Sequence, residues 1–176
     1  MLFLEGIVAV KLTSKTRWRE KLERQDCSKI LPTPKAWQKQ FGAGTMLIAN
    51  PLEVDALIRK TRRGQLITVS EIRSRLARDH NTDTTCPLTT GIFVRIAAET
   101  AEEDLRNGRK RITPYWRVVK DDGSLYEKFP GGVTAQSRRL KGEGHSLVRG
   151  KGKRPPKVRD FEKALVDMTR GSDRRG

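Results

Sequence analysis

The sequence predicts an α+β fold, a winged helix-turn-helix-like domain with a small β-hairpin and with helical and basic extensions. Three observations support this class. Two helical patterns follow each other closely, at about 69–79 and 86–105. A pair of short alternating runs around an Asp-Gly turn comes next, at 116–128, and basic residues then accumulate toward the C-terminus. Paired helices with a hairpin beside them are typical of a DNA-binding winged domain.

The charge balance indicates a polyanionic partner. Lys and Arg number 37 against 21 Asp and Glu, which gives a formal net charge of +16. Such an excess attracts DNA or RNA. The alternative is a solvated basic surface, as in many small RNA-associated proteins.

The first ten residues, MLFLEGIVAV, are apolar but too few to span a bilayer, and they lack the basic start of a secretory signal. We interpret them as a strand, a packed arm or a misplaced start. We therefore expect an intracellular, cytoplasmic protein without a membrane partner, associated with the nucleoid if it is bacterial. Cys27 and Cys86 lie far apart without a CxxC pair, so neither a zinc site nor a disulfide scaffold is predicted, and no cofactor is expected.

The residues up to 45 are predicted to form a basic N-terminal arm of short helices, capped at Ser14 and Thr33. The main domain, 46–147, starts with a helix after Asn50-Pro51 that ends by Gly64. Thr68 and Glu71 then form a capping box, which predicts a helix to about Asp79.

A second helix follows the polar turn HNTDTT and runs from about Cys86 to Leu105. Pro87 is tolerated in its first turn, and Asn107-Gly108 closes it. Two helices with this short turn suggest that the second helix enters a DNA groove. The alternative is an ordinary helical hairpin.

The runs Trp116–Lys120 and Ser124–Lys128 alternate around Asp121-Asp122-Gly123 and predict a β-hairpin that serves as the wing. Thr134 is predicted to cap a further helix through Lys141. Residues 148–176 are predicted to be a basic, flexible C-terminal tail with one short amphipathic helix around Phe161. From Arg138 to the end, 13 basic residues face 5 acidic ones.

Several short motifs between residues 107 and 144 follow one another in an order and spacing that match a single protein family. Pro114, Arg117, Val118 and Val119 form one motif, the Asp122-Gly123 turn follows, and Gln136, Leu140, Glu143 and Gly144 mark the last helix. Asn107 stands eight positions before Tyr115. On these residues, 64–145 resemble the DNA-binding catalytic domain of the alkylguanine DNA alkyltransferase family, including its alkyltransferase-like branch. The resemblance implies a winged helix-turn-helix, an Asn hinge and an active-site strand.

The departures from the family pattern bear on activity. The resemblance places the alkyl-accepting cysteine at Tyr115 and its activating histidine at Trp116. A phenol with a pKa near 10 is a far weaker nucleophile at neutral pH than a thiol with a pKa near 8.5. Alkyl transfer is therefore expected to be lost, and Glu143 is expected to keep a structural role, such as bonding backbone amides near the hinge.

Two further family devices are absent. The tyrosine that rotates the target phosphate corresponds to Val69, and the arginine that replaces a flipped base falls near Leu88. Arg73 and Arg95 are nearby residues that could substitute, but the sequence does not favour either. Tyr115 is expected to be a pocket wall, and Trp116 to be core, because neighbours on a strand face opposite ways. The sequence leaves two roles open for Arg117: it contacts a phosphate, or it pairs with an acidic residue.

The sequence thus predicts a non-catalytic protein that binds double-stranded DNA and senses alkylated or damaged bases in DNA repair; its protein partners are not specified. The alternatives are an alkyltransferase-type enzyme with Cys86 or Tyr115 as acceptor, and a basic RNA-associated or partner-binding module. No catalytic residue or metal ligand is predicted. The former active-site and pocket residues are Asn107, Pro114, Tyr115, Trp116, Arg117 and Glu143, and the candidate DNA-binding residues are Ser70, Arg73, Thr84, Thr85, Thr89, Arg95, Arg149, Lys151, Lys153 and Arg154.

Overall fold

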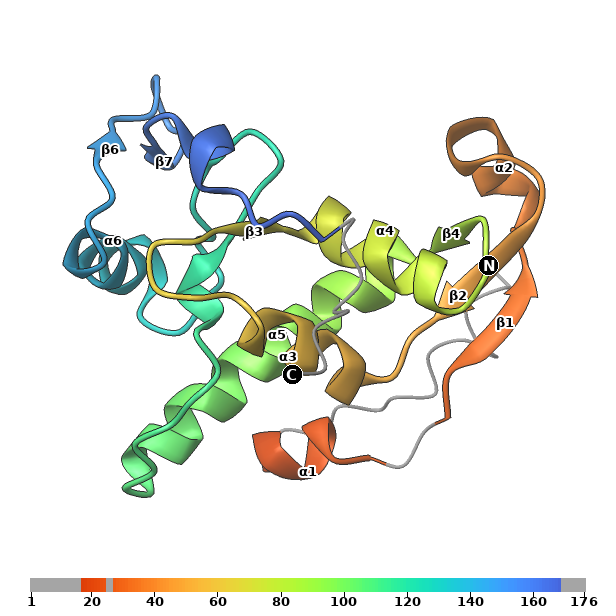
Figure 1. Ribbon diagram of the computed structural model, residues 1–176, viewed down its shortest axis with the longest axis horizontal. Helices are drawn as coiled ribbons and strands as arrows, with labels where there is room; N and C mark the ends of the chain where they lie inside the picture. The colour runs from red at the N-terminus through yellow and green to blue at the C-terminus, as the bar shows by residue number, and fades with distance from the viewer. Residues whose placement is uncertain (1–16, 25–26, 169–176) are drawn as a thin grey trace, which may run out of the picture.

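Three helices form the centre of the computed structural model, which describes residues 17–24 and 27–168. They are α3 (Pro51–Arg59), α4 (Val69–Asp79) and α5 (Pro87–Arg106), and α5 packs against the other two (Figure 1). The mixed α+β class predicted from the sequence is confirmed. No helix within the described ranges is long and apolar enough to cross a membrane.

The predicted helix starts of α3, α4 and α5 match the structure. Asn50 and Thr68 each cap a helix through a reciprocal capping box, which satisfies backbone N–H groups that the first turn leaves unpaired. Cys86 precedes α5, and Pro87 takes its first position. The helix predicted to reach Gly64 ends earlier, with Lys60 as its C-cap.

The N-terminal part contains strands as well as the predicted short helices. After α1 (Trp18–Leu22) come β1 (Lys29–Pro32), α2 (Lys35–Phe41) and β2 (Thr45–Ile48). Strand β2 lies between β1, to which it is antiparallel, and the two-residue β4 (Thr84–Thr85), to which it is parallel. The turn between α4 and α5 is thereby fixed to the N-terminal part. The opening stretch 1–10 and the predicted cap at Ser14 lie outside the described residues.

The predicted β-hairpin at 116–128 is wrong. Residues Tyr115–Arg117 form a turn of 3₁₀ helix, η1, and β5 (Val118–Val119) pairs in parallel with β3 (Ile67–Thr68). Residues 124–128 form no strand with β5, although the Lys120 N–H donates to the Ser124 carbonyl at 2.9 Å and closes the turn. Both valines of β5 are fully buried, so this strand lacks the half-exposed alternation of a hairpin wing.

The C-terminal part is folded through residue 168, so the predicted flexible tail is wrong for 148–168. Helix α6 (Gly132–Gly142) is followed by the antiparallel pair β6 (Leu147–Val148) and β7 (Lys157–Val158) and by η2 (Phe161–Ala164). The predicted amphipathic helix is only this 3₁₀ turn. Val158, Phe161 and Met168 are buried, and this apolar area offsets the entropy of ordering the basic segment.

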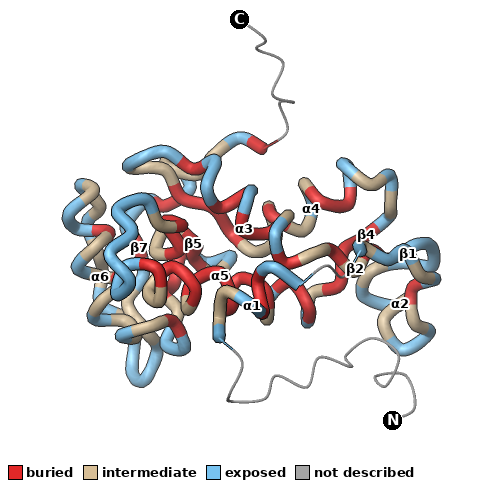
Figure 2. The backbone as a smooth tube through the Cα atoms, turned by 90° about the horizontal axis from the view of Figure 1, so that it is seen from below, coloured by how far each residue is buried: buried red, intermediate tan, exposed pale blue. Residues whose placement is uncertain are grey.

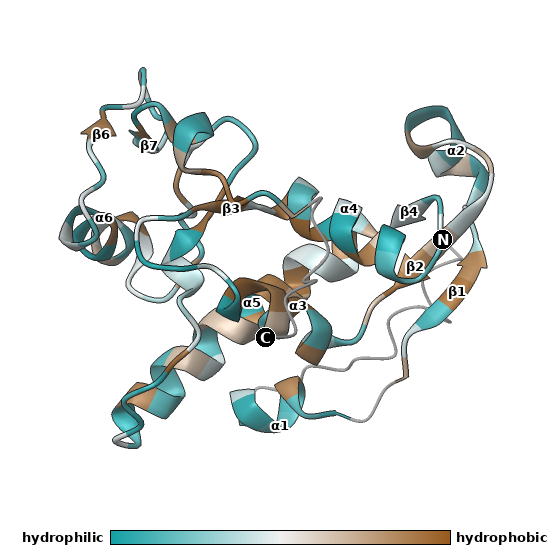
Figure 3. Cartoon of the chain, viewed as in Figure 1, coloured by the Kyte–Doolittle hydropathy of each residue, from teal (hydrophilic) through white to brown (hydrophobic). Residues whose placement is uncertain are grey.

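The core has two clusters of buried side chains. The larger one lies among α3, α4 and α5, and the smaller one joins β5 and α6 to the C-terminal segment. Figure 2 shows buried backbone running through α3, α5 and β5, and Figure 3 shows hydrophobic colour concentrated on β2, β3 and α3. Trp116 is half-buried and packs against both clusters, which places η1 at their junction.

Candidate nucleic-acid interface

The aromatic run at 114–116 is packed into the protein. Tyr115 is 1% exposed, and its ring makes edge contacts with Trp116 and with Phe129, at centroid distances of 5.6 and 5.5 Å. The prediction that Tyr115 forms a pocket wall is therefore wrong. The turn of η1, rather than an extended strand, directs Tyr115 inward and leaves Trp116 half-exposed.

The Tyr115 hydroxyl has a fixed acceptor. It donates to Glu102 Oε1 at 2.7 Å, and Arg139 Nη2 donates to the same oxygen at 2.5 Å. Burial, and then the hydrogen bond and charge of Glu102, raise the pKa of Tyr115 well above its ordinary value. The phenol is therefore held protonated at neutral pH, which is the unreactive form for attack on an alkyl group.

Glu143 holds η1 against the loop before β3. Its carboxylate accepts from Trp116 Nε1 at 2.8 Å, from Arg117 Nη2 at 2.8 Å and from the Gly64 N–H at 3.0 Å. Burial would raise the pKa of Glu143, but the bonds from Arg117, Gly64 and Trp116 outweigh it and lower the pKa. Arg117 thus has an acidic partner, and the backbone amide that Glu143 binds is that of Gly64.

The other two residues of the predicted active-site group lie at the edges of this cluster. Pro114 is buried and caps η1. Asn107 is exposed at the C-cap of α5, where its N–H donates to the Glu103 carbonyl at 3.0 Å.

A small apolar cavity is lined in part by Phe129, the residue whose ring contacts Tyr115. Its volume is about 140 Å³. The walls come from the start of α4, from the first half of α5 and from the segment after the Asp-Gly turn. They are Val69, Gly91, Val94, Arg95, Tyr126, Lys128 and Phe129.

The cavity combines an aromatic wall with a cationic surround. The rings of Tyr126 and Phe129 stack at 4.6 Å with an interplanar angle of 24°. Arg95 and Lys128 are exposed residues that line the cavity, and Arg95 Nε lies 3.8 Å from Glu99 Oε1 in an ion pair along α5. Burial, and then the nearby charges of Asp121 and Asp122, raise the pKa of Tyr126 to about 12, so the ring is neutral at physiological pH. The cavity therefore suits a flat, uncharged ring attached to an anionic backbone.

The predicted phosphate contacts at the start of α5 are wrong. Thr84, Thr85 and Thr89 are all buried: β4 pairs with β2 in the N-terminal sheet, and the Thr89 hydroxyl, in the first turn of α5, donates to the Cys86 carbonyl at 3.4 Å. The Thr85 hydroxyl donates to the Arg73 carbonyl at 2.9 Å. Arg73 is itself committed, since its Nε donates to the Thr85 carbonyl at 2.9 Å and its guanidinium lies over the Phe41 ring at 4.9 Å.

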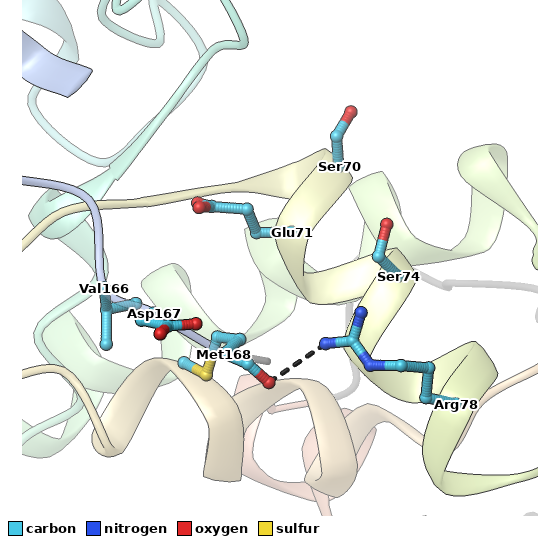
Figure 4. Close-up of a pocket in the computed structure, with 7 residues that line it drawn as sticks. All are labelled: Ser70, Glu71, Ser74, Arg78, Val166, Asp167 and Met168. Atoms are coloured by element: carbon cyan, nitrogen blue, oxygen red, sulfur yellow. Dashed lines mark hydrogen bonds between the residues drawn. The ribbon is translucent and has the colours of Figure 1, made fainter. Parts of the chain in front are cut away.

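Ser70 lies at the start of α4, where its hydroxyl donates to Asp121 Oδ2 at 2.7 Å. A second cavity, of about 310 Å³, lies beside this end of α4 and beneath the C-terminal segment (Figure 4). Glu71 and Asp167 line it, and Arg78 Nη2 is bound to the Met168 carbonyl at 2.9 Å. With two carboxylates in its walls and its arginine occupied, this larger cavity is a poor site for phosphate or DNA.

The predicted basic residues of the C-terminal part are clustered. Arg149, Lys151, Lys153 and Arg154 are all exposed on the loop that joins β6 to β7. In Figure 1 this loop lies at the end of the molecule opposite α2. Four of the predicted DNA-binding residues therefore lie together on one exposed loop, in a different part of the chain from the three buried threonines at the start of α5.

The sequence reasoning missed the cavity residues Gly91, Tyr126, Lys128 and Phe129. An available signal was the FPGG run after the turn, where Gly131 and Gly132 both have positive φ and mark a change of chain direction at the start of α6. Within the described ranges, no three His, Cys, Asp or Glu side chains converge to hold a metal ion.

The sequence matches no protein-family model and no curated protein. Among solved structures, the chain is similar to S. pombe Atl1, an alkyltransferase-like protein. That structure is of Atl1 in complex with damaged DNA containing O6-carboxymethylguanine. The sequence identity is 16%, the match covers 66% of this chain and 93% of the Atl1 chain, and the TM-score is 0.46. A similarity this distant assigns no function to the chain, whose role has to be inferred from its own side chains.

Proposed function

We propose that this chain binds double-stranded DNA and holds one extrahelical base, in particular an alkylated guanine, in the cavity of about 140 Å³ beside Phe129. Binding is non-covalent, and the chain acts as a sensor of damaged bases, not as a repair enzyme. The observation that carries the proposal is the stacked Tyr126–Phe129 wall in a cavity that Arg95 and Lys128 also line.

Size and chemistry support a single base as the occupant. Pockets for drug-sized ligands measure roughly 300–1,000 Å³, so a cavity of about 140 Å³ admits only a small ring system. Stacking of a base on an aromatic side chain contributes about 1–3 kcal/mol, which is comparable with the few kcal/mol needed to unstack it. An unpaired or alkylated base costs less to extrude, and this difference favours damaged sites.

The proposal excludes covalent transfer to the residue that replaces the cysteine. Tyr115 is buried, protonated and bound to Glu102, and Cys86 is buried at the N-cap of α5. Neither side chain lines the cavity. Intact protein mass after incubation with an alkylguanine duplex is expected to be unchanged, and a gain of one alkyl group would favour the enzyme hypothesis.

The decisive binding test uses Gly91, which lines the cavity from α5. A Cβ at Gly91 would meet nothing within 4 Å, so substitution there should leave the fold intact. Gly91→Leu adds a bulky side chain to the cavity wall, and Gly91→Ala is the matched control. Fluorescence anisotropy would compare matched duplexes with guanine or alkylguanine.

We expect the wild type and Gly91→Ala to bind the alkylguanine duplex more tightly than the plain one. Gly91→Leu is expected to bind both duplexes with the plain-duplex affinity. An unchanged preference in Gly91→Leu would reject the cavity as the base site. Stronger binding to duplex RNA than to either DNA would instead favour an RNA-associated module.

A further inference from the structure

The segment between β6 and β7 forms a tight, narrow tip. We call residues 147–158 the C-terminal ribbon. At its tip the Arg154 N–H donates to the Lys151 carbonyl at 3.2 Å, and Gly152 supplies the positive φ of 61° that this turn requires. A Cβ at Gly150 would overlap the backbone carbonyls of Arg154 and Pro155, so the two sides of the loop are in close contact.

The base of the ribbon is fixed to the turn that precedes the cavity. The Leu125 N–H donates to the Pro156 carbonyl at 3.0 Å, and the Val158 N–H donates to the Gly123 carbonyl at 3.0 Å. Val158 is buried in the smaller core cluster. Because Tyr126 follows Leu125 directly, the base of the ribbon lies next to a residue that lines the proposed base cavity, and the fold sets the direction of the ribbon.

The tip is strongly basic. Residues 144–159 contain six Lys or Arg and no Asp or Glu. The four cations Arg149, Lys151, Lys153 and Arg154 are exposed, and none of them forms an ion pair with any other residue that the structure describes. Their charge is therefore available to an external anion.

The short strands of the ribbon favour contact with duplex DNA through the tip and not through a strand face. A β-ribbon reads the major groove with the side chains of one face. Here each strand has two residues, which is about 7 Å of length, and Val158 and Leu147 turn inward to the smaller core cluster. Only the tip is free. Arginine and lysine on a narrow arm are attracted into a narrow minor groove, where the negative potential is strongest.

We propose that the C-terminal ribbon enters the minor groove of the bound duplex tip first and makes affinity depend on A·T content at the point of entry. The inference rests on the proposed DNA binding and adds a specificity element to it. The 2-amino group of guanine lies in the minor groove. A base pair that carries this group therefore obstructs the ribbon tip, and a base pair that lacks it admits the tip.

Four undamaged duplexes of equal length test this through their minor grooves. Their central tracts are A·T, G·C, inosine·cytosine, which lacks the 2-amino group, and 2,6-diaminopurine·T, which carries it. Anisotropy titrations should give similar affinities for the first and third. The two duplexes that carry the amino group should bind on the order of fivefold more weakly.

Matched variants locate the effect on the ribbon. The triple substitution Lys151→Gln, Lys153→Gln and Arg154→Gln should abolish the discrimination and lower the salt dependence by about one unit of slope for each lost contact. The control triple Arg106→Gln, Lys110→Gln and Arg111→Gln removes three exposed cations at the far end of α5 and should keep the discrimination. Gly150→Ala disturbs the tip and keeps every charge, so it should weaken discrimination while largely preserving the salt slope.

The outcomes separate the two proposals. Failure of the wild type to bind any duplex rejects the proposed function itself. Equal affinity of the wild type for all four duplexes would reject groove entry. So would a ribbon triple variant whose affinity falls by the same factor on all four duplexes, because the tip would then contact only phosphates. Circular dichroism of each variant confirms that the fold is retained.

Discussion

Arg117 and Glu143 form a buried ion pair at 2.8 Å, with side chains only 11% and 7% exposed. The same Glu143 carboxylate also accepts hydrogen bonds from the indole N–H of Trp116 and the backbone N–H of Gly64. Arg117 in turn donates to the Thr61 carbonyl at 2.5 Å. One carboxylate therefore joins the turn η1, the end of α6 and the loop before β3.

Removing this carboxylate should destabilise the protein. Glu143→Gln leaves the Arg117 charge buried without a counter-ion, and loss of one partner of a buried pair costs about 3–5 kcal/mol. Chemical denaturation would measure the free energy of unfolding. The control is Asp79→Asn in the Arg75–Asp79 pair of α4, because the Asp79 side chain is 42% exposed; we expect a loss of at most about 1 kcal/mol. Equal losses in the two variants would contradict the assignment.

Acid should remove the contribution of Glu143. Its pKa is lowered in the folded protein, so the stabilisation is present above the ordinary carboxyl value of 4.5 and is lost as pH falls through the folded value. The difference in unfolding free energy between wild type and Glu143→Gln should therefore narrow progressively below about pH 4.5. A difference that stays constant into strong acid would show that the pKa is not depressed.

The Tyr115 hydroxyl is expected to serve stability alone. Tyr115→Phe removes the bond to Glu102, which still accepts from Arg139, so the loss should be about 1 kcal/mol. Tyr115→Ala should cost about 3–5 kcal/mol because it also empties the core. Thermal and chemical unfolding measure both, and DNA titrations should show that Tyr115→Phe binds plain and alkylguanine duplexes as the wild type does.

Thr85 is expected to contribute to the fold and not to DNA affinity. Thr85→Val keeps the side-chain shape but removes the hydroxyl bond to the Arg73 carbonyl, at a cost of about 1–3 kcal/mol. Thr134→Val, at an exposed position in α6, is the control and should change stability by less than about 0.5 kcal/mol. An altered salt dependence of DNA binding in Thr85→Val would restore Thr85 as a phosphate contact.

Gly123 lies where the Asp-Gly turn packs against the C-terminal segment, and both its backbone conformation and this close contact require glycine. Its φ is 80°, and a Cβ there would overlap the Phe161 ring. Gly42→Ala is a matched control, because its φ is 82° and nothing lies within 4 Å of the added atom. Both substitutions incur backbone strain, but Gly123→Ala should cost about 1–3 kcal/mol more through overpacking. Similar unfolding energies for the two would exclude a tight contact with Phe161.

Local signals in the sequence were reliable where a few neighbouring residues decide the structure. Asn50 with Pro51, and Thr68 with Glu71, mark the starts of α3 and α4 because the capping bonds are made within one helical turn. The alternation around Asp122-Gly123 was misleading. It identified a real turn, but the partner of Val118 proved to be Ile67, far away in the chain.

The sequence by itself determined the helix starts, the excess of positive charge and the presence of a phenol rather than a thiol at position 115, since each is a matter of residue identity or short-range bonding. Only the tertiary structure decided that Thr84 and Thr85 are buried, that Tyr115 faces Glu102, and that the basic C-terminal segment is a fixed ribbon. These features depend on contacts between segments far apart in the chain. Burial and long-range pairing, which no local pattern encodes, set which side chains can meet DNA.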